Sequence, residues 1–312
     1  TVRKKGYRLV VEPEYLQEET ALINDEENSE TKSLLNKSVN WGILFIVLII
    51  GVISNWNLFS GSSSDNQEAN IESITNAPGR EVYPVVSPDN RHLIFSWRRI
   101  GHQPNLFIRD FKDVNQAPRQ LTYSDDYEGP AVWHPNGEVI YFPRKQWDYS
   151  RCDIVELNIV TEEQKVIGKC TGELDFSLAI SPDGKQLAFI EVNEKTHSQK
   201  VKFINTKDSS QSITAYTCEI DCNYNDLDTV YSPDGKYLAV SRTYDEGLNE
   251  DIFLFDIEKQ SFEQLTNTEG DIKGMIWHPD GDRIVFSSRV SGKRNGYVIN
   301  IKNKRVDNLN IP

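Results

Sequence analysis

Basic side chains cluster in the first eleven residues, TVRKKGYRLVV, and their chemistry is that of phosphate binding. The positive charges lie on Arg3, Lys4, Lys5 and Arg8, whereas the whole chain of 312 residues carries a formal net charge of −13. The pattern predicts a tight hairpin that turns at positions 4–6. Such a hairpin can place an arginine in a DNA minor groove and lysines on the phosphates. The alternative is a solvated cationic turn beside a membrane surface.

Four cysteines could form disulfides, and four cysteines allow three pairings. Cys152 and Cys170 are equidistant from position 161, where a turn is predicted, so they would face each other across two strands. Cys218 and Cys222 lie in a 12-residue connection where the equivalent connections have eight residues, which favours a local staple. Each pair could stabilise the fold or act as a redox sensor. A zinc site is not favoured, because no paired histidines accompany the CxxxC spacing.

Catalytic motifs are missing from the sequence. The segment GSSSD at 61–65 lacks the GxSxG nucleophile elbow, and there is no HExxH, P-loop or EF-hand pattern. We therefore predict that the chain is not an enzyme and binds no metal or cofactor. His134 and His278 are expected to cap turns, and the acidic residues of SDDYE (124–128) and YNDLD (224–228) are expected to be solvated loop residues.

One apolar segment interrupts an otherwise polar chain. No charged residue occurs from Ser38 to Ser64, and the 21 residues from Val39 to Phe59 are enough to cross a bilayer as a helix. A buried core helix or a cleaved signal peptide fits less well, because the segment has no polar stripe and a mainly polar segment of about 38 residues precedes it. We predict a transmembrane helix over 38–59.

The distribution of lysine and arginine predicts the orientation of this helix. Lys32 and Lys37 precede it, and no basic residue follows until Arg80. By the positive-inside rule the N-terminus is cytoplasmic and the C-terminal part is outside, periplasmic in a Gram-negative bacterium. Outside the cytoplasm disulfides are permitted. The acidic segment 12–37 is expected to be a mobile cytoplasmic tether, and the segment 60–70 a flexible linker.

Bulk composition describes a globular domain with a short apolar insertion. The chain is 38% hydrophobic and 26% charged, which is ordinary for a soluble fold. A pI near 4.9 excludes nucleic-acid binding by the chain as a whole and confines any such role to a local basic patch.

Five segments after the apolar stretch repeat one pattern, an apolar strand, a turn of the form [SH]-P-[DN]-[GN], and a second apolar strand. Their prolines are spaced 47, 47, 51 and 46 residues apart. Proline presets the backbone of such a turn, Asp or Asn bonds to nearby backbone, and the last turn residue accepts positive φ. The predicted turn residues are Pro88 and Asp89, Pro135 and Asn136, Pro182 and Asp183, Pro233 and Asp234, and Pro279 and Asp280.

Two further strands follow in each unit, and four strands per ~47 residues are typical of a β-propeller blade. The sequence therefore predicts an all-β fold. The repeats resemble the PD40/WD40-like blades of TolB-like propellers from Gly79 to the C-terminus. The segment 71–84 looks like an outer strand that completes a last blade, although 305–309 supplies one too. Either the five blades close on themselves with a redundant outer strand, or the chain stops before a sixth blade. Because TolB-like rings generally have six blades, we favour the incomplete ring.

The N-terminal segment TVRKKGYRL closely resembles the wing hairpin that ends OmpR/PhoB-type winged-helix domains. The order of segments resembles the layout of ToxR/CadC-like one-component transcriptional regulators. That layout is a winged helix, an acidic tether, one membrane helix and an external propeller. The resemblance implies that Arg3 lies nearest DNA and that Tyr7 packs within the hairpin. The recognition helix of that family is absent, so the chain is expected to be an N-terminally truncated part of a longer protein.

This layout implies five parts: a wing hairpin (1–11), a cytoplasmic linker (12–37), a membrane helix (38–59), a flexible linker (60–70) and a periplasmic propeller (71–312). The expected partners are promoter DNA, the inner membrane and an unknown periplasmic ligand or protein. Binding of the external ligand to the propeller would change the conformation of the linker or the dimerisation of the protein. A homodimer is one expected state. The alternative functions are a membrane-anchored interaction scaffold and the non-catalytic part of a prolyl-oligopeptidase-like peptidase.

Overall fold

The computed structural model describes residues 7–9, 71–75, 77–113, 116–148, 150–171, 177–193, 198–208, 212–214, 224–244, 249–268, 270–290 and 292–309. The chain divides into two compact units, Thr1–Asn76 and Ala77–Pro312. The second unit therefore begins later than residue 71, at which the sequence places the start of the propeller. All of the described secondary structure is β-strand.

In the first unit, β1 (Tyr7–Leu9) pairs antiparallel with β2 (Ile71–Ser73). The strand predicted after the basic turn is thus present, but β2 belongs to none of the blade sheets and does not complete a last blade. Residues 1–6, 10 and 11 of the predicted wing lie outside the described residues. The described residues contain no helix that is long and apolar enough to cross a bilayer, and the predicted span at 38–59 is not among them.

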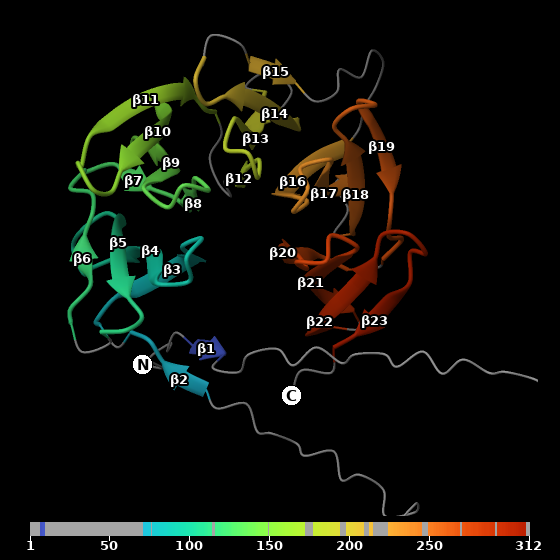
Figure 1. The fold of residues 1–312 in the computed structure, drawn as a ribbon, viewed down its shortest axis with the longest axis horizontal. Helices are drawn as coiled ribbons and strands as arrows, with labels where there is room; N and C mark the ends of the chain where they lie inside the picture. The colour runs from blue at the N-terminus through green and yellow to red at the C-terminus, as the bar shows by residue number, and fades with distance from the viewer. Residues whose placement is uncertain are drawn as a thin grey trace, which may run out of the picture. The chain divides into compact units, whose positions relative to one another are not determined.

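The second unit folds into five antiparallel sheets, each an up-and-down meander of one repeat (Figure 1). We call them blades 1 to 5 in chain order. Blade 1 consists of β3 (Arg80–Val86), β4 (His92–Arg98), β5 (Asn105–Asp110) and β6 (Arg119–Gln120). Blade 2 consists of β7 (Tyr127–Glu128), β8 (Val132–Trp133), β9 (Val139–Lys145), β10 (Cys152–Asn158) and β11 (Gln164–Lys169), and blade 3 of β12 (Leu178–Ile180), β13 (Gln186–Val192), β14 (Gln199–Asn205) and β15 (Ser212–Thr214). Blade 4 consists of β16 (Tyr224–Tyr231), β17 (Tyr237–Tyr244), β18 (Glu250–Asp256) and β19 (Ser261–Gln264), and blade 5 of β20 (Ile272–Trp277), β21 (Arg283–Val290), β22 (Lys293–Asn300) and β23 (Val306–Asn308).

The repeated turns explain why each unit folds back on itself. In all five turns the amide of the last residue donates to the carbonyl three residues earlier, at 2.8 to 3.0 Å. The same residue has a φ between 56° and 74°, a region that glycine and asparagine tolerate. Those residues are Asn90, Gly137, Gly184, Gly235 and Gly281. The turns identified in the sequence thus directly precede β4, β9, β13, β17 and β21, one in every blade.

Side chains of the turns add a second set of bonds. In blade 3 the Ser181 hydroxyl donates to Asp183 at 2.7 Å and accepts from the amide of Gln186 at 2.9 Å. In blades 2 and 5, Nδ1 of His134 and of His278 accepts a backbone amide two residues on, at 3.1 and 3.3 Å. The histidines therefore cap turns, as the sequence suggests.

The inner strand of a blade bends at one place. Blades 1, 4 and 5 have a register shift near its middle, at Val82/Val85, Asp226/Asp228 and Lys273/Ile276. Blade 2 breaks there into β7 and β8. A bulge bends a strand and increases its twist, which lets the first half of the strand meet the neighbouring blade while the second half lines the ring.

Hydrophobic cores lie between the blades rather than within one centre. Ile94 and Leu106 of blade 1 pack with Phe142 of blade 2, and Leu254 of blade 4 packs with Phe286 of blade 5. Similar clusters join blade 2 to blade 3 and blade 3 to blade 4. In blades 2 to 4, alternate residues of a strand thus face opposite neighbouring blades, as period-two patterning requires.

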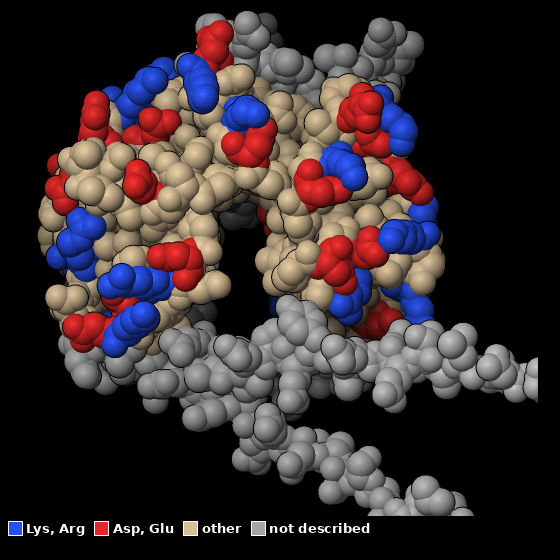
Figure 2. All heavy atoms as spheres, in the orientation of Figure 1, with Lys and Arg blue, Asp and Glu red and all other residues tan. Residues whose placement is uncertain are grey.

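The ring is open, as the sequence predicts. Blades 1 and 5 lie at the two ends of an arc, and no described strand joins them (Figure 1). The centre of the ring is hollow, and acidic and basic side chains are interspersed around it (Figure 2). The outer strand expected at 305–309 is present as β23.

One face of blade 5 is therefore left without a neighbouring blade, and we call it the free face. Ile276, Val285 and Val298 pair across β20, β21 and β22 on the side turned away from blade 4. Their equivalents in blade 4 include Ala239 and Leu254, which are buried against blade 5. Ile276 is 59% exposed, whereas Leu254 is 6% exposed.

Candidate ligand-binding pocket

Two neighbouring loops form a pocket on the side of blade 1 opposite to its proline turn. One loop connects β4 to β5, and the other connects β6 to β7 of the next blade. Between them lies a cavity of about 510 Å³. Its lining is polar and includes one exposed aromatic ring. The lining residues are Arg98, Arg99, Gly101, His102, Gln103, Asn105, Gln120, Tyr123, Ser124 and Asp125.

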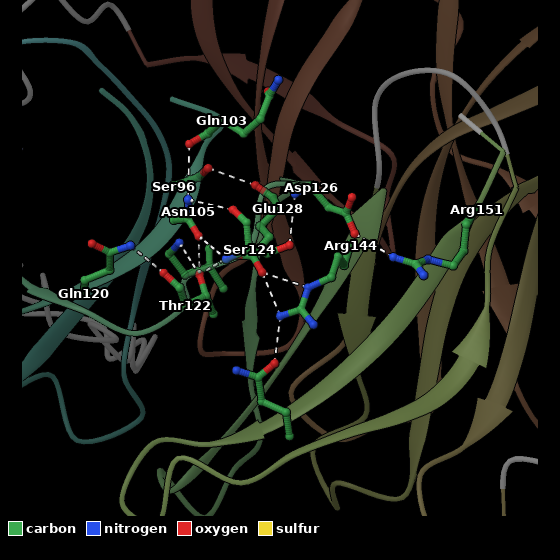
Figure 3. A network of polar contacts seen from close by, with 12 residues as sticks. Ser96, Gln103, Asn105, Gln120, Thr122, Ser124, Asp126, Glu128, Arg144 and Arg151 are labelled. Atoms are coloured by element: carbon green, nitrogen blue, oxygen red, sulfur yellow. Dashed lines mark hydrogen bonds and ion pairs between the residues drawn. The ribbon is translucent and has the colours of Figure 1, made fainter. Parts of the chain in front are cut away.

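Asn105 fastens the two loops together beneath this pocket (Figure 3). Its side-chain amide donates to the carbonyls of Gln103 and Ser124, each at 3.2 Å. Its side-chain oxygen accepts the amide of Ser124 at 2.9 Å. Because Asn105 is buried and bonded to both loops, it holds the pocket in one shape.

An ion pair lies under the same loops, in the network that Figure 3 shows. Arg144 in β9 donates to Glu128 in β7 at 2.7 and 2.9 Å, and the Glu128 side chain is fully buried. Glu128 also accepts a hydrogen bond from the hydroxyl of Thr122, which itself accepts the amide of Leu106 at 2.9 Å. Burial raises the pKa of Glu128, and the bonds from Thr122 and Arg144 oppose that rise.

Blade 4 repeats this pair. Arg242 in β17 donates to Asp226 in β16 at 2.7 Å, and their side chains are 5% and 2% exposed. The other oxygen of Asp226 accepts the amide of Val201 in blade 3 at 3.2 Å. Arg242 also lies against the rings of Tyr224 and Phe253, at 3.8 and 4.9 Å from their centroids. In both blades a buried carboxylate thus links its own blade to the third strand of the preceding one.

The expectation that the acids of these two segments are all solvated loop residues is therefore wrong for Glu128, Asp226 and Asp228, the last of which lies in β16 and accepts the hydroxyl of Ser177 at 2.7 Å. A signal was present in the sequence. In blades 2 and 4 the acid stands seven residues before the turn proline and the arginine nine residues after it. In the blade geometry those offsets place acid and arginine opposite each other. In blade 5 the same positions hold Ile272 and Ser288.

The electrostatics of the pocket favour negative charge. Arg98 and Arg99 bring two positive charges and Asp125 one negative charge. No carboxylate of the described residues forms an ion pair with either arginine. The Arg99 guanidinium donates to Gln120 at 3.1 Å and lies 5.4 Å from the centroid of the Phe107 ring, so it is held in place, and its remaining N–H groups have no hydrogen-bond partner among the described residues.

The site residues predicted from the sequence do not lie in this pocket. The turn prolines and acids lie at the opposite end of the blade strands. Cys152 and Cys170 form the predicted disulfide, which joins β10 to the end of β11. Cys218 and Cys222, and the wing residues Arg3, Lys4 and Lys5, lie outside the described residues, as does the side chain of Arg8. The described residues contain no cluster of side chains that could hold a metal ion.

Sequence reasoning missed the pocket itself, because its residues lie in connections that do not repeat from blade to blade. Arg98 and Arg99 are 20 residues and more from Gln120 and Tyr123 along the chain. Only the pairing of β5 with both β4 and β6 brings the two groups together.

Comparisons with known proteins agree with this fold. Residues 170–311 match the family model described as PD40, TolB beta propeller domain. TolB from Acinetobacter baumannii has a similar structure, with a TM-score of 0.62 and 16% identity over 77% of this chain and 56% of that one. Hydrazine synthase of Kuenenia stuttgartiensis has a TM-score of 0.57 and 19% identity over 75% of this chain and 67% of that one.

A prolyl endopeptidase structure is similar as well, with a TM-score of 0.55 and 12% identity over 75% of this chain and 36% of that one. At these identities the likeness establishes the fold, and this chain spans just over half of the Acinetobacter protein. A search of curated proteins found no match. The chain thus carries a propeller of five blades, and residues 170–311 of it match the PD40 model.

Proposed function

We propose, from the premise that the second unit is a TolB-like PD40 propeller, that it is the external sensor of a membrane-anchored one-component transcriptional regulator. The propeller would bind a small ligand, and a winged-helix head at the N-terminal end would bind promoter DNA. The observation that carries the sensing role is the pocket of about 510 Å³, a volume within the range of small-molecule sites.

The remaining support comes from the order of segments along the chain. Basic residues in TVRKKGYRL resemble a DNA-contacting wing, and the uncharged stretch 38–64 follows an acidic tether. Ligand binding on one side would then shift the population of linker or dimer states and change the local concentration of winged heads at a promoter. The propeller supplies rigid loops for binding, and the tethers supply the response.

The pairing of β1 with β2 stands against this topology. A chain that crosses a membrane once between Leu9 and Ile71 would hold these strands on opposite sides, so the pairing and the span exclude each other. The topology can be measured with reporter enzymes fused at Thr1 and after Pro312 in living cells. We expect activity of the cytoplasmic reporter at Thr1 and of the exported reporter at Pro312. If both termini were found in the same compartment, the proposal that the protein is a membrane-spanning regulator would be refuted.

The sensing role has its own experiment. Residues 77–312 are deleted from the gene, or replaced by an unrelated folded domain of similar size as the control for simple truncation. We expect promoter occupancy and transcription to stop responding to external conditions in both strains. An unchanged response would refute sensing by the propeller while leaving the membrane topology untouched.

A protein-interaction scaffold is the second candidate function, and the free face of blade 5 favours it. Ile276 is exposed beside Val285 and Val298, in an apolar row that the other blades bury. A partner that covers this row would protect Ile276 from solvent, which chemical footprinting of the chain in cells and after purification can detect. Equal labelling in both states would exclude the scaffold role.

A further inference from the structure

We propose that the pocket between the β4–β5 and β6–β7 loops binds an acidic saccharide, one whose sugar ring carries a carboxylate. The inference rests on the proposed function in treating the pocket as a sensing site. It goes beyond that function by naming the class of ligand from the side chains of the pocket.

The carboxylate would bind at the two arginines. Arg98 and Arg99 line the pocket without an ion-pair partner among the described residues. A guanidinium presents a planar set of donors that matches the two oxygens of a carboxylate. The Arg99 guanidinium is oriented in advance by Gln120 and by the rings of Trp97 and Phe107, at 5.9 and 5.4 Å from their centroids. Less side-chain entropy is therefore lost when the anion binds.

The sugar ring would bind beside Tyr123. This side chain lines the pocket, is 77% exposed, and donates its hydroxyl to the carbonyl of Gln120 at 3.3 Å. An exposed aromatic ring offers a flat apolar face, which suits the C–H face of a sugar. Gln103 and Ser124 line the same pocket and can exchange hydrogen bonds with the hydroxyls of the sugar.

The buried network under the pocket makes the site preformed. Asn105, Thr122 and Glu128 are all buried, and their hydrogen bonds fix the ends of both loops. Arg144 neutralises Glu128, so this buried acid does not repel an anion above it. The pocket is lined by two arginines and by one acid, Asp125. Its lining therefore carries one net positive charge.

The test measures binding to the full chain by titration calorimetry. The probes are D-glucuronate, D-glucose as the same ring without the carboxylate, and inorganic phosphate as an anion without the ring. We expect D-glucuronate to bind with a Kd of roughly millimolar or tighter. We expect D-glucose and phosphate to bind at least tenfold more weakly.

Variants locate the site. Arg98→Gln with Arg99→Gln should weaken D-glucuronate binding at least tenfold, and Tyr123→Ala should weaken it severalfold. The control is Arg119→Gln, an exposed arginine outside the pocket, which should change nothing. Circular dichroism and the melting temperature show whether each variant is folded. A folded double variant with unchanged affinity, equal binding of D-glucose or phosphate, or no binding of D-glucuronate at tens of millimolar would overturn the proposal.

The experiments distinguish between two outcomes: that the proposed ligand class is wrong, and that the propeller is not a sensor. Binding of D-glucuronate without any change in transcription would leave the ligand class intact and refute sensing through this pocket. Absence of binding, with a transcriptional response that the arginine variants abolish, would refute the ligand class and leave sensing intact.

Discussion

At the residue scale, the turns hold the blades against one another as well as closing their own hairpins. Gly184 of blade 3 lies against the ring of His134 in the turn of blade 2, and a Cβ at position 184 would come within 2.2 Å of its Nε2. The imidazole is not free to move away without cost, because its Nδ1 accepts the amide of Asn136. This glycine is therefore required both by its backbone and by its neighbour.

Two alanine substitutions separate these requirements. Gly184 and Gly281 have φ of +73° and +74°, but a Cβ at position 281 meets nothing within 4 Å. Gly281→Ala should lower the free energy of unfolding by about 1 kcal/mol through backbone strain alone. Gly184→Ala should cost a further ~1–3 kcal/mol from the clash with His134. Urea denaturation measures both, and equal losses would show that the contact between blades is unimportant.

The turn aspartates make stability depend on pH. The hydroxyl of Ser181 and the amide of Lys185 lower the pKa of Asp183 from 3.8 to about 2. Because folding favours the ionised carboxylate, its stabilisation is complete above the unfolded pKa and is lost as the pH falls through the folded one. The stability difference between the wild type and Asp183→Asn should thus be largest above pH 3.8 and should shrink toward pH 2. A difference that does not change with pH would contradict this assignment.

At the element scale, the buried pairs of blades 2 and 4 tie strands of adjacent blades together. Removing Arg242 would leave Asp226 buried and unpaired, so Arg242→Leu should lower the free energy of unfolding by ~3–5 kcal/mol. The control is Arg119→Leu, because Arg119 and Glu162 form a pair that is 49% and 64% exposed. Such a surface pair is worth at most about 1 kcal/mol. Similar losses in the two variants, measured by urea denaturation, would refute the buried tie.

The elements themselves could be predicted from the sequence, and the pocket could not. The turns recur with a proline and a residue that accepts positive φ, so their chemistry fixes where each hairpin reverses. Glu128 and Arg144 stand at offsets that repeat in blade 4, so a comparison of blades would have found the ion pair. Arg99 and Tyr123 follow no repeat. Their proximity depends on the pairing of three strands, which local patterns do not encode.

At the scale of the whole molecule, the arc of five blades leaves the free face of blade 5 uncovered. Ile276→Arg should therefore change the free energy of unfolding by less than about 0.5 kcal/mol. Leu254→Arg, at an equivalent face that blade 5 covers, should prevent folding or cost more than about 4 kcal/mol, because it buries an unpaired charge. Chemical denaturation of the two variants compares them. A large loss for Ile276→Arg would mean that this face is covered in solution.

The number of blades also could be predicted, because each blade has its own turn motif. The β1–β2 pair could not, since the basic N-terminal segment and the segment after the apolar stretch show no pattern that relates them. The prediction that 71–84 completes a last blade was wrong for β2, because strand patterning identifies a strand but not its partner.

An arc of blades behaves like a linear stack of repeats, in which the middle members have two supports and the outermost have one. Blades 1 and 5 should then fray before blade 3, and protection against hydrogen exchange should decline toward both ends of the stack. Amides of β13 should exchange most slowly, and those of β4 and β21 faster. Uniform protection would mean that the ends are joined, and the protein would then unfold as one closed cooperative body rather than peeling from its ends.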